Sequence, residues 1–86
     1  MDKDLHFKLD DLHFALDGRM LLSREEIISD IESVGYTVDS DVTAKTDYLV
    51  QSNTPGNRIT RKLRKAIQNK VEIITEDQLY LLIQIK

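Results

Sequence analysis

The strongest constraint on the fold of this chain is the regular alternation of short apolar segments with amphipathic helical segments. Strand-forming residues occupy four short segments, residues 12–16, 36–38, 48–50 and 71–74. Helical segments follow the first, third and fourth of them. This order, β-α-β-β-α-β-α, is typical of an α/β fold. We therefore predict a four-stranded, mostly parallel sheet covered by helices on both faces.

Two capping boxes predict where helices begin. Ser23 is followed three residues later by Glu26, and Thr75 is followed three residues later by Gln78. In a capping box the two side chains bond reciprocally to backbone N–H groups that the first helical turn leaves free. Gly35 predicts the end of the first helix. The residues that we expect to be buried are Phe14, Leu16, Ile27, Ile31, Val38, Leu49, Val50, Leu63, Ile67, Ile73, Ile74, Leu79 and Leu82.

A short repeat opens the chain, because residues 5–11 read LHFKLDD and residues 12–18 read LHFALDG. We interpret the second copy as the first central strand and the first copy as an edge strand or lead-in. The predicted organisation is an N-terminal lead-in or edge strand over residues 1–8 and a single domain over residues 9–86.

The charges are unevenly distributed. Six cations and no acid lie between residues 57 and 70; because the net charge is −3, the rest of the chain sums to −9. The basic segment also has an apolar stripe, which predicts a helix with its cations facing outward. Such a segment is either a solvated helix face or a surface that contacts phosphates. The outward residues are predicted to be Arg61, Lys62 and Lys65, and the apolar stripe consists of Ile59, Leu63, Ala66 and Ile67.

The sequence offers little for catalysis. It has no cysteine, no cluster of His, Asp and Glu at metal-ligand spacing, and only isolated glycines. Ser23 is better explained as a helix cap than as a nucleophile. We predict no enzymatic activity, no metal and no cofactor. The N-terminal segment MDKDLHFKLDD is acidic and lacks an apolar stretch, so we expect that it is not a signal peptide. Because the sequence also has no apolar run of about 18 residues, we expect an intracellular protein that does not contact the membrane.

A series of local motifs resembles the BRCT domain. The likeness is greatest to the BRCT domain of bacterial NAD-dependent DNA ligases and to that of the large subunit of replication factor C, and it covers about residues 9 to 84. The resemblance implies a parallel sheet in the order 2-1-3-4, with the first and third helices on one face and the second on the other. The motifs are FALDG at 14–18, SREE at 23–26, IESVG at 31–35, VTAKTDYLV at 42–50, KA at 65–66 and IITED at 73–77.

The resemblance also implies a phosphate site. In the family, a Ser or Thr before a Gly at the end of the first strand, the N–H of that Gly, and a Lys in a T-x-K pattern hold a phosphate. Members that bind the 5′-phosphate of DNA add an Arg at the start of the first helix. The corresponding candidates here are Gly18, Arg24, Thr60, Arg61 and Lys62, with Lys65 further along the basic segment.

Asp17 departs from this pattern, because it stands where the phosphate-binding hydroxyl is expected. An ionised carboxylate donates no hydrogen bond. Two like charges about 4 Å apart repel by about 4 kcal/mol at an effective dielectric constant near 20. A hydrogen bond to a charged group contributes only about 1.5–3 kcal/mol. A phosphate held in the usual geometry is therefore disfavoured, and a structural role for Asp17 is an Asx-type turn.

The resemblance implies a non-catalytic module of DNA replication or repair. We expect it to bind the DNA backbone without reading sequence, to recruit a repair enzyme, or both, and to belong to or assist an enzyme such as an NAD-dependent DNA ligase. The alternative is a module for protein interaction without phosphate, including self-association as a homodimer. A phosphopeptide is disfavoured as a ligand, because a single domain lacks the second unit of tandem readers. The expected location is the bacterial cytoplasm or nucleoid in preference to a nucleus.

Overall fold

The computed structural model describes residues 12–54, 56 and 58–84. The lead-in or edge strand predicted over residues 1–8 lies outside the described residues. Along the described chain the elements are β1 (His13–Leu16), α2 (Arg24–Ser33), β2 (Thr37–Asp39), β3 (Tyr48–Gln51), α3 (Arg61–Gln68), β4 (Glu72–Thr75) and α4 (Glu76–Gln84). The predicted element order is confirmed, and no strand end differs from its prediction by more than one residue.

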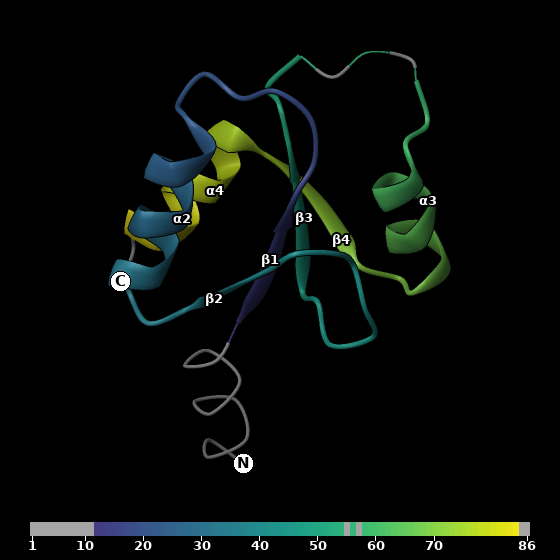
Figure 1. Ribbon diagram of the computed structural model, residues 1–86, viewed down its shortest axis with the longest axis horizontal. Coiled ribbons are helices and arrows are strands. Elements are labelled where there is room, and N and C mark those ends of the chain that lie inside the picture. The colour runs from purple at the N-terminus through teal and green to yellow at the C-terminus, as the bar shows by residue number, and fades with distance from the viewer. Residues whose placement is uncertain (1–11, 55, 57, 85–86) are drawn as a thin grey trace.

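The strands form one parallel sheet in the order β2-β1-β3-β4. Helices α2 and α4 lie side by side on one face of this sheet, and α3 covers the other face (Figure 1). The predicted fold class, strand order and distribution of helices are therefore confirmed. In this arrangement the carboxyl ends of β1 and β3 lie at the same edge of the sheet, next to the start of α3.

The predicted helix ends are also confirmed. The Ser23 hydroxyl accepts the Glu26 N–H, and the Glu26 carboxylate accepts the Ser23 N–H. Thr75 and Gln78 form the same reciprocal pair at the start of α4, with distances of 2.9 and 3.2 Å. The chain leaves α2 through Gly35, whose φ of +92° lies in the region that favours glycine. Local sequence signals thus determine both helix starts.

Buried side chains form two clusters, one on each side of the sheet. Phe14 belongs to the larger cluster, between the sheet and the pair α2 and α4, where its ring lies 5.6 Å from that of Tyr36 and 5.3 Å from that of Tyr48. The smaller cluster lies under α3 and contains Leu49 and Ala66. Most of the predicted core is buried or half-buried.

Two core predictions are wrong, and both concern the α3 side of the sheet. Ile67 is 61% exposed and Ile73 is 39% exposed. Helix α3 packs on the sheet through Leu63 and Ala66, so Ile67 lies beside the contact. Ile73 is on β4, an edge strand, where it pairs with Leu49 and lies at the margin of what α3 covers. Ile59, part of the predicted apolar stripe, is also 61% exposed.

The motif at residues 42–50 has a structural explanation. The buried Thr46 hydroxyl donates to Asp39 Oδ2 at 2.9 Å and accepts the Thr43 N–H at 3.0 Å. The Asp47 carboxylate accepts the backbone N–H of His13 at 2.8 Å. The Thr and Asp of this motif therefore join the loop before β3 to β1 and β2, which makes them determinants of the fold.

Candidate functional site

The candidate site begins where β1 ends. The Asp17 N–H donates to the Val50 carbonyl at 2.9 Å, which extends the pairing with β3 by one residue. Gly18 then adopts φ +87°. No other group would touch a Cβ at this position, so the glycine is required by its backbone conformation and not by lack of space. Its N–H group therefore lies in a sharp turn at the carboxyl end of β1.

The side chain of Asp17 bonds to a distant residue. Its Oδ2 accepts the Thr60 hydroxyl at 2.6 Å. Thr60 is the N-cap of α3, and its oxygen accepts the Leu63 N–H at 3.1 Å. The Asp17 side chain, predicted to bond to nearby backbone in an Asx-type turn, bonds instead to Thr60, 43 residues later in the chain. Asp17 thus places a carboxylate at the N-terminus of α3, where the helix dipole favours negative charge.

Lys62 also reaches the end of β1. Its Nζ donates to the Leu16 carbonyl at 2.7 Å. The T-x-K pattern therefore brings a hydroxyl and an ammonium group to the same end of the strand. We call Asp17, Gly18, Thr60 and Lys62 the β1 corner.

A hollow of about 520 Å³ opens at the β1 corner. Two carboxylates and two cations line it, so its charges nearly balance. The Thr60 hydroxyl already donates to Asp17, and the Lys62 ammonium already donates one bond to the strand end. An incoming phosphate would have to replace these bonds and would meet the Asp17 charge. The residues that line the hollow are Asp17, Ser40, Asp41, Thr60, Arg61 and Lys62.

Lys65 is not part of a free outward stripe. Its Nζ lies 2.7 Å from Asp41 Oδ2. The hydrogen bond from Lys65, followed by that from the Val42 N–H, lowers the pKa of Asp41 below its usual range. Of the three residues predicted to face outward, Arg61 is exposed, whereas Lys62 and Lys65 are half-buried and their ammonium groups bond to Leu16 and Asp41.

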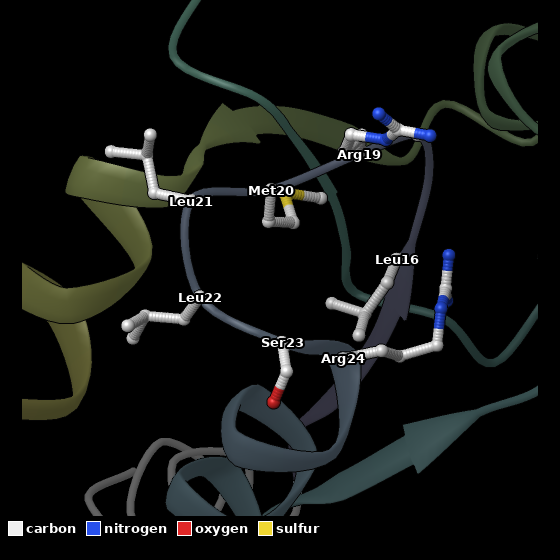
Figure 2. A pocket seen from close by; sticks show the side chains of 8 residues that line it. Leu16, Arg19, Met20, Leu21, Leu22, Ser23 and Arg24 are labelled. Atoms are coloured by element: carbon white, nitrogen blue, oxygen red, sulfur yellow. The ribbon is translucent and has the colours of Figure 1, made fainter.

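Arg24, the remaining candidate, lies on the other side of the turn. It is exposed at the start of α2 and borders a second hollow of about 600 Å³, which Gly18 and Leu16 also line. Figure 2 shows this hollow enclosed by the loop between β1 and α2, with the Arg24 side chain at one side. The turn at residues 17–18 therefore separates a hollow that contains Lys62 from a hollow bordered by Arg24.

The sequence reading missed the role of Glu76. This residue is only 3% exposed, although it carries a carboxylate. Its Oε1 accepts the Leu21 N–H at 2.8 Å and its Oε2 accepts the Leu22 N–H at 3.1 Å. The first residue of α4 thus fixes the loop between β1 and α2. In the sequence, Glu76 is one of the two residues between Thr75 and Gln78 of the second capping box. This position does not indicate that its carboxylate binds a loop 54 and 55 residues earlier in the chain.

Two negative findings apply to the described residues. In residues 12–54, 56 and 58–84, no group of three or more His, Cys, Asp or Glu side chains is placed to hold a metal ion. Within the same part of the chain, every helix is too short or too polar to cross a bilayer.

Comparison with known proteins identifies one family. The family model of the BRCA1 C Terminus (BRCT) domain matches residues 5–83. The DNA ligase of Mycoplasmopsis synoviae (strain 53) is 34% identical over 77 residues, which cover 90% of this chain and 11% of the ligase. The DNA ligase of Thermosipho africanus (strain TCF52B) is 39% identical over 72 residues, which cover 83% of this chain and 10% of the ligase.

A solved structure supports the same fold. The crystal structure of Rad4 BRCT1,2 in complex with a Crb2 phosphopeptide matches with a TM-score of 0.72 at 22% sequence identity. The match covers 90% of this chain and 40% of that one. The chain spans about a tenth of the length of the ligases that it matches.

Proposed function

The chain belongs to the BRCT family, and from this premise we propose that it is a non-catalytic module that helps to place a DNA replication or repair enzyme on DNA. It contacts the phosphate backbone and does not read base sequence. The observation that carries the proposal is the exposed arginines on and before α3, Arg58, Arg61 and Arg64, in a segment without an acid.

These arginines are arranged to reach a charged surface. Arg61 and Arg64 are three residues apart and therefore lie on the same side of α3, and both are exposed. A guanidinium group binds phosphate oxygens through two parallel hydrogen bonds. Phosphate contacts fix a protein on the duplex without carrying sequence information. Lys62 and Lys65 support this function indirectly, because their contacts with Leu16 and Asp41 hold the helix on the sheet.

The similarity to bacterial DNA ligases suggests the enzyme concerned. We propose that the chain acts within or beside a DNA ligase and that the ligation chemistry belongs to other parts of that enzyme. The corresponding location is the bacterial cytoplasm or nucleoid.

A salt titration of DNA binding tests the proposal. For contacts with duplex DNA, log K falls linearly with log salt with a slope of about −0.9 for each phosphate neutralised. The double variant Arg61→Gln and Arg64→Gln should weaken binding and make the slope less negative by about 2, because two contacts are lost. Lys45→Glu changes the net charge by the same amount at an exposed loop residue, so it serves as the matched control.

Two outcomes would contradict DNA binding by α3. One is negligible binding by the natural chain at about 50 mM salt, where backbone contacts are strong. The other is an equal loss of affinity in the arginine variant and in Lys45→Glu, because that result indicates a dependence on net charge alone. Thermal unfolding should show that both variants remain folded, since exposed substitutions usually change stability by no more than about 0.5 kcal/mol.

A second candidate function is protein interaction without phosphate. It is favoured by Asp17, whose carboxylate opposes a phosphate at the β1 corner, and by Leu21, which is 83% exposed. Phosphopeptide binding, which the description of the Rad4 structure names for that protein, faces the same opposing charge here.

A further inference from the structure

We infer that the loop between β1 and α2, residues 17–23, is a self-association surface on which two copies of this chain meet about a twofold axis. Three features of the loop carry the inference: a protruding leucine, a hollow beside it, and charges of opposite sign on its two sides. This surface is distinct from the arginines of α3.

The protruding leucine is held in place. Leu21 is 83% exposed, and Leu22 is also exposed. Both backbone N–H groups donate to the buried carboxylate of Glu76, so the backbone is fixed from inside. Figure 2 shows the Leu21 side chain directed away from the loop. An apolar side chain presented by an anchored backbone loses little conformational freedom on binding, which favours association.

The hollow lies directly beside this leucine. It has a volume of about 600 Å³; the half-buried Met20 contributes apolar surface to it, and the buried Leu16 lies at its base. Figure 2 shows both of these side chains inside the curve of the loop. The same short loop therefore offers a projecting apolar group and an apolar recess that can receive one.

The charges around the loop have opposite signs on opposite sides. Arg19 and Arg24 are exposed, and Figure 2 shows both on the side away from α4. Asp77 is exposed on α4, next to the Glu76 that binds the loop. Glu26 is exposed on α2, on the side that faces α4. Tyr80 of α4 has a raised pKa, mainly because its side chain is partly buried and donates a hydrogen bond to Asp30, and the nearby charge of Glu26 is a smaller cause.

The surface formed by this loop and its flanking charges is self-complementary. In a twofold interface the same patch meets itself, so each contact occurs twice. With the axis between two loops, Leu21 of each copy faces the hollow of the other. The basic side of each copy, Arg19 and Arg24, then faces the acidic side of the other, Glu26 and Asp77. DNA is a poorer occupant of this patch, because the two carboxylates repel phosphates.

The association should be weak. One loop and its rim form a small patch, and interfaces that bury less than about 1,200 Å² in total are typical of transient complexes. We therefore expect monomers at low micromolar concentration and a growing dimer fraction toward about 1 mM. Sedimentation equilibrium over this range measures the dissociation constant directly.

The leucine contact is tested by two matched substitutions. Leu21→Ser removes the projecting group and should raise the dimer dissociation constant by at least about tenfold, because burial of a leucine side chain is worth more than that factor. Leu81→Ser is the control, since Leu81 is 64% exposed on α4 outside the patch. It should leave the dissociation constant unchanged. Equal effects of the two substitutions would overturn the proposed surface.

A charge exchange tests the orientation. Arg19→Glu and Asp77→Lys should each weaken the homodimer, because each places like charges face to face. A mixture of the two variants should associate more tightly than either alone, since the introduced carboxylate of one variant faces the introduced ammonium group of the other only in the mixed pair. Absence of this recovery would rule out the twofold arrangement.

Two further results would overturn the inference. One is a chain that remains monomeric at about 1 mM. The other is a monomeric chain whose amide signals at residues 19–24 shift on addition of blunt duplex DNA, because the occupant of the patch would then be DNA. Leu21→Ser should leave DNA binding at low micromolar concentration unchanged, so failure of this inference is distinguishable from failure of DNA binding by α3.

Discussion

The two faces of the sheet are covered in different ways. On the side of α2 and α4, ten buried residues in the described chain form one cluster that includes Phe14 and Leu79. On the side of α3, five buried residues form a smaller cluster. Helix α3 is joined to the sheet and its loops by polar contacts from Thr60, Lys62 and Lys65. The helices on one face are therefore held to the sheet mainly by apolar packing, with polar bonds joining α4 to α2 and to the first loop. The helix on the other face depends on both packing and polar bonds to the sheet and its loops.

This difference explains how a strongly basic helix belongs to a small domain. An amphipathic helix with a wide apolar face has few positions left for charge. Because polar bonds assist the attachment of α3, its exposed side can carry Arg61 and Arg64. The face covered by α2 and α4 has the larger apolar cluster and contributes more to the stability of the domain. The face covered by α3 has the smaller cluster, and the outer side of that helix is available for binding.

The largest expected effect compares one leucine from each face. Leu79→Ala should lower the free energy of unfolding by about 2–5 kcal/mol, because Leu79 is fully buried between α4 and the sheet. Leu63, on α3, is only half-buried. Leu63→Ala should therefore lower the free energy of unfolding by less than about half as much as Leu79→Ala does. Denaturant titration of both variants measures the difference. Equal losses would mean that α3 depends on apolar packing as strongly as α4 does.

The next effect concerns the bond between Asp17 and Thr60. Asp17→Thr removes the carboxylate that opposes a phosphate and releases the Thr60 hydroxyl, so the β1 corner gains donors and loses a negative charge. Duplex DNA with a recessed 5′-phosphate should then bind at least about tenfold more tightly, which needs about 1.4 kcal/mol. The comparison uses the same duplex without the phosphate at fixed salt. A natural chain that already prefers the phosphorylated end would show that Asp17 does not oppose the ligand.

A smaller effect is expected at Lys62. Lys62→Met keeps the aliphatic stem and removes the ammonium that bonds to the Leu16 carbonyl. Loss of this bond should lower the free energy of unfolding by about 1 kcal/mol. Arg61→Met, at the exposed neighbouring position, should change it by less than about 0.5 kcal/mol. If the two variants lost equal stability, the Lys62 contact would not hold α3.

The smallest effect is a pH dependence at Asp41. The hydrogen bond from Lys65 lowers the pKa of Asp41 in the folded chain below its ordinary value of 3.8. A carboxylate with a depressed folded pKa stabilises the fold above the unfolded pKa, and this contribution disappears as the pH falls through the folded pKa. The difference in stability between the natural chain and Lys65→Met should therefore shrink below about pH 4. A difference that stays constant between about pH 3 and about pH 6 would contradict the pairing.

Most of the fold could be predicted because its signals are local. The capping boxes at Ser23 and Thr75 and the glycine after α2 act over three or four residues, and the structure contains them as predicted. The sheet order came from the BRCT resemblance. The exposure of Ile67 and Ile73 could not be predicted, because it depends on how much of the sheet α3 covers. The helix packs through Leu63 and Ala66 and leaves Ile67 and the edge strand β4 partly uncovered.

The candidate site was predicted less completely, because its contacts join residues far apart in the chain. The BRCT resemblance implied that Thr60 and Lys62 lie near the end of β1, and the structure brings both there. The sequence could not show that Thr60 bonds to Asp17 or that Lys65 pairs with Asp41. Each of these contacts depends on the side-chain positions that the packed sheet imposes.

The bond from Glu76 to the first loop has a consequence for the order of synthesis. The loop between β1 and α2 is made early, but its anchor belongs to the first residue of the last described helix, 54 and 55 residues later in the chain. A ribosome must therefore complete nearly the whole domain before Leu21 and Leu22 find their acceptor. A nascent chain that stops before residue 76 therefore carries this loop without the carboxylate that anchors it.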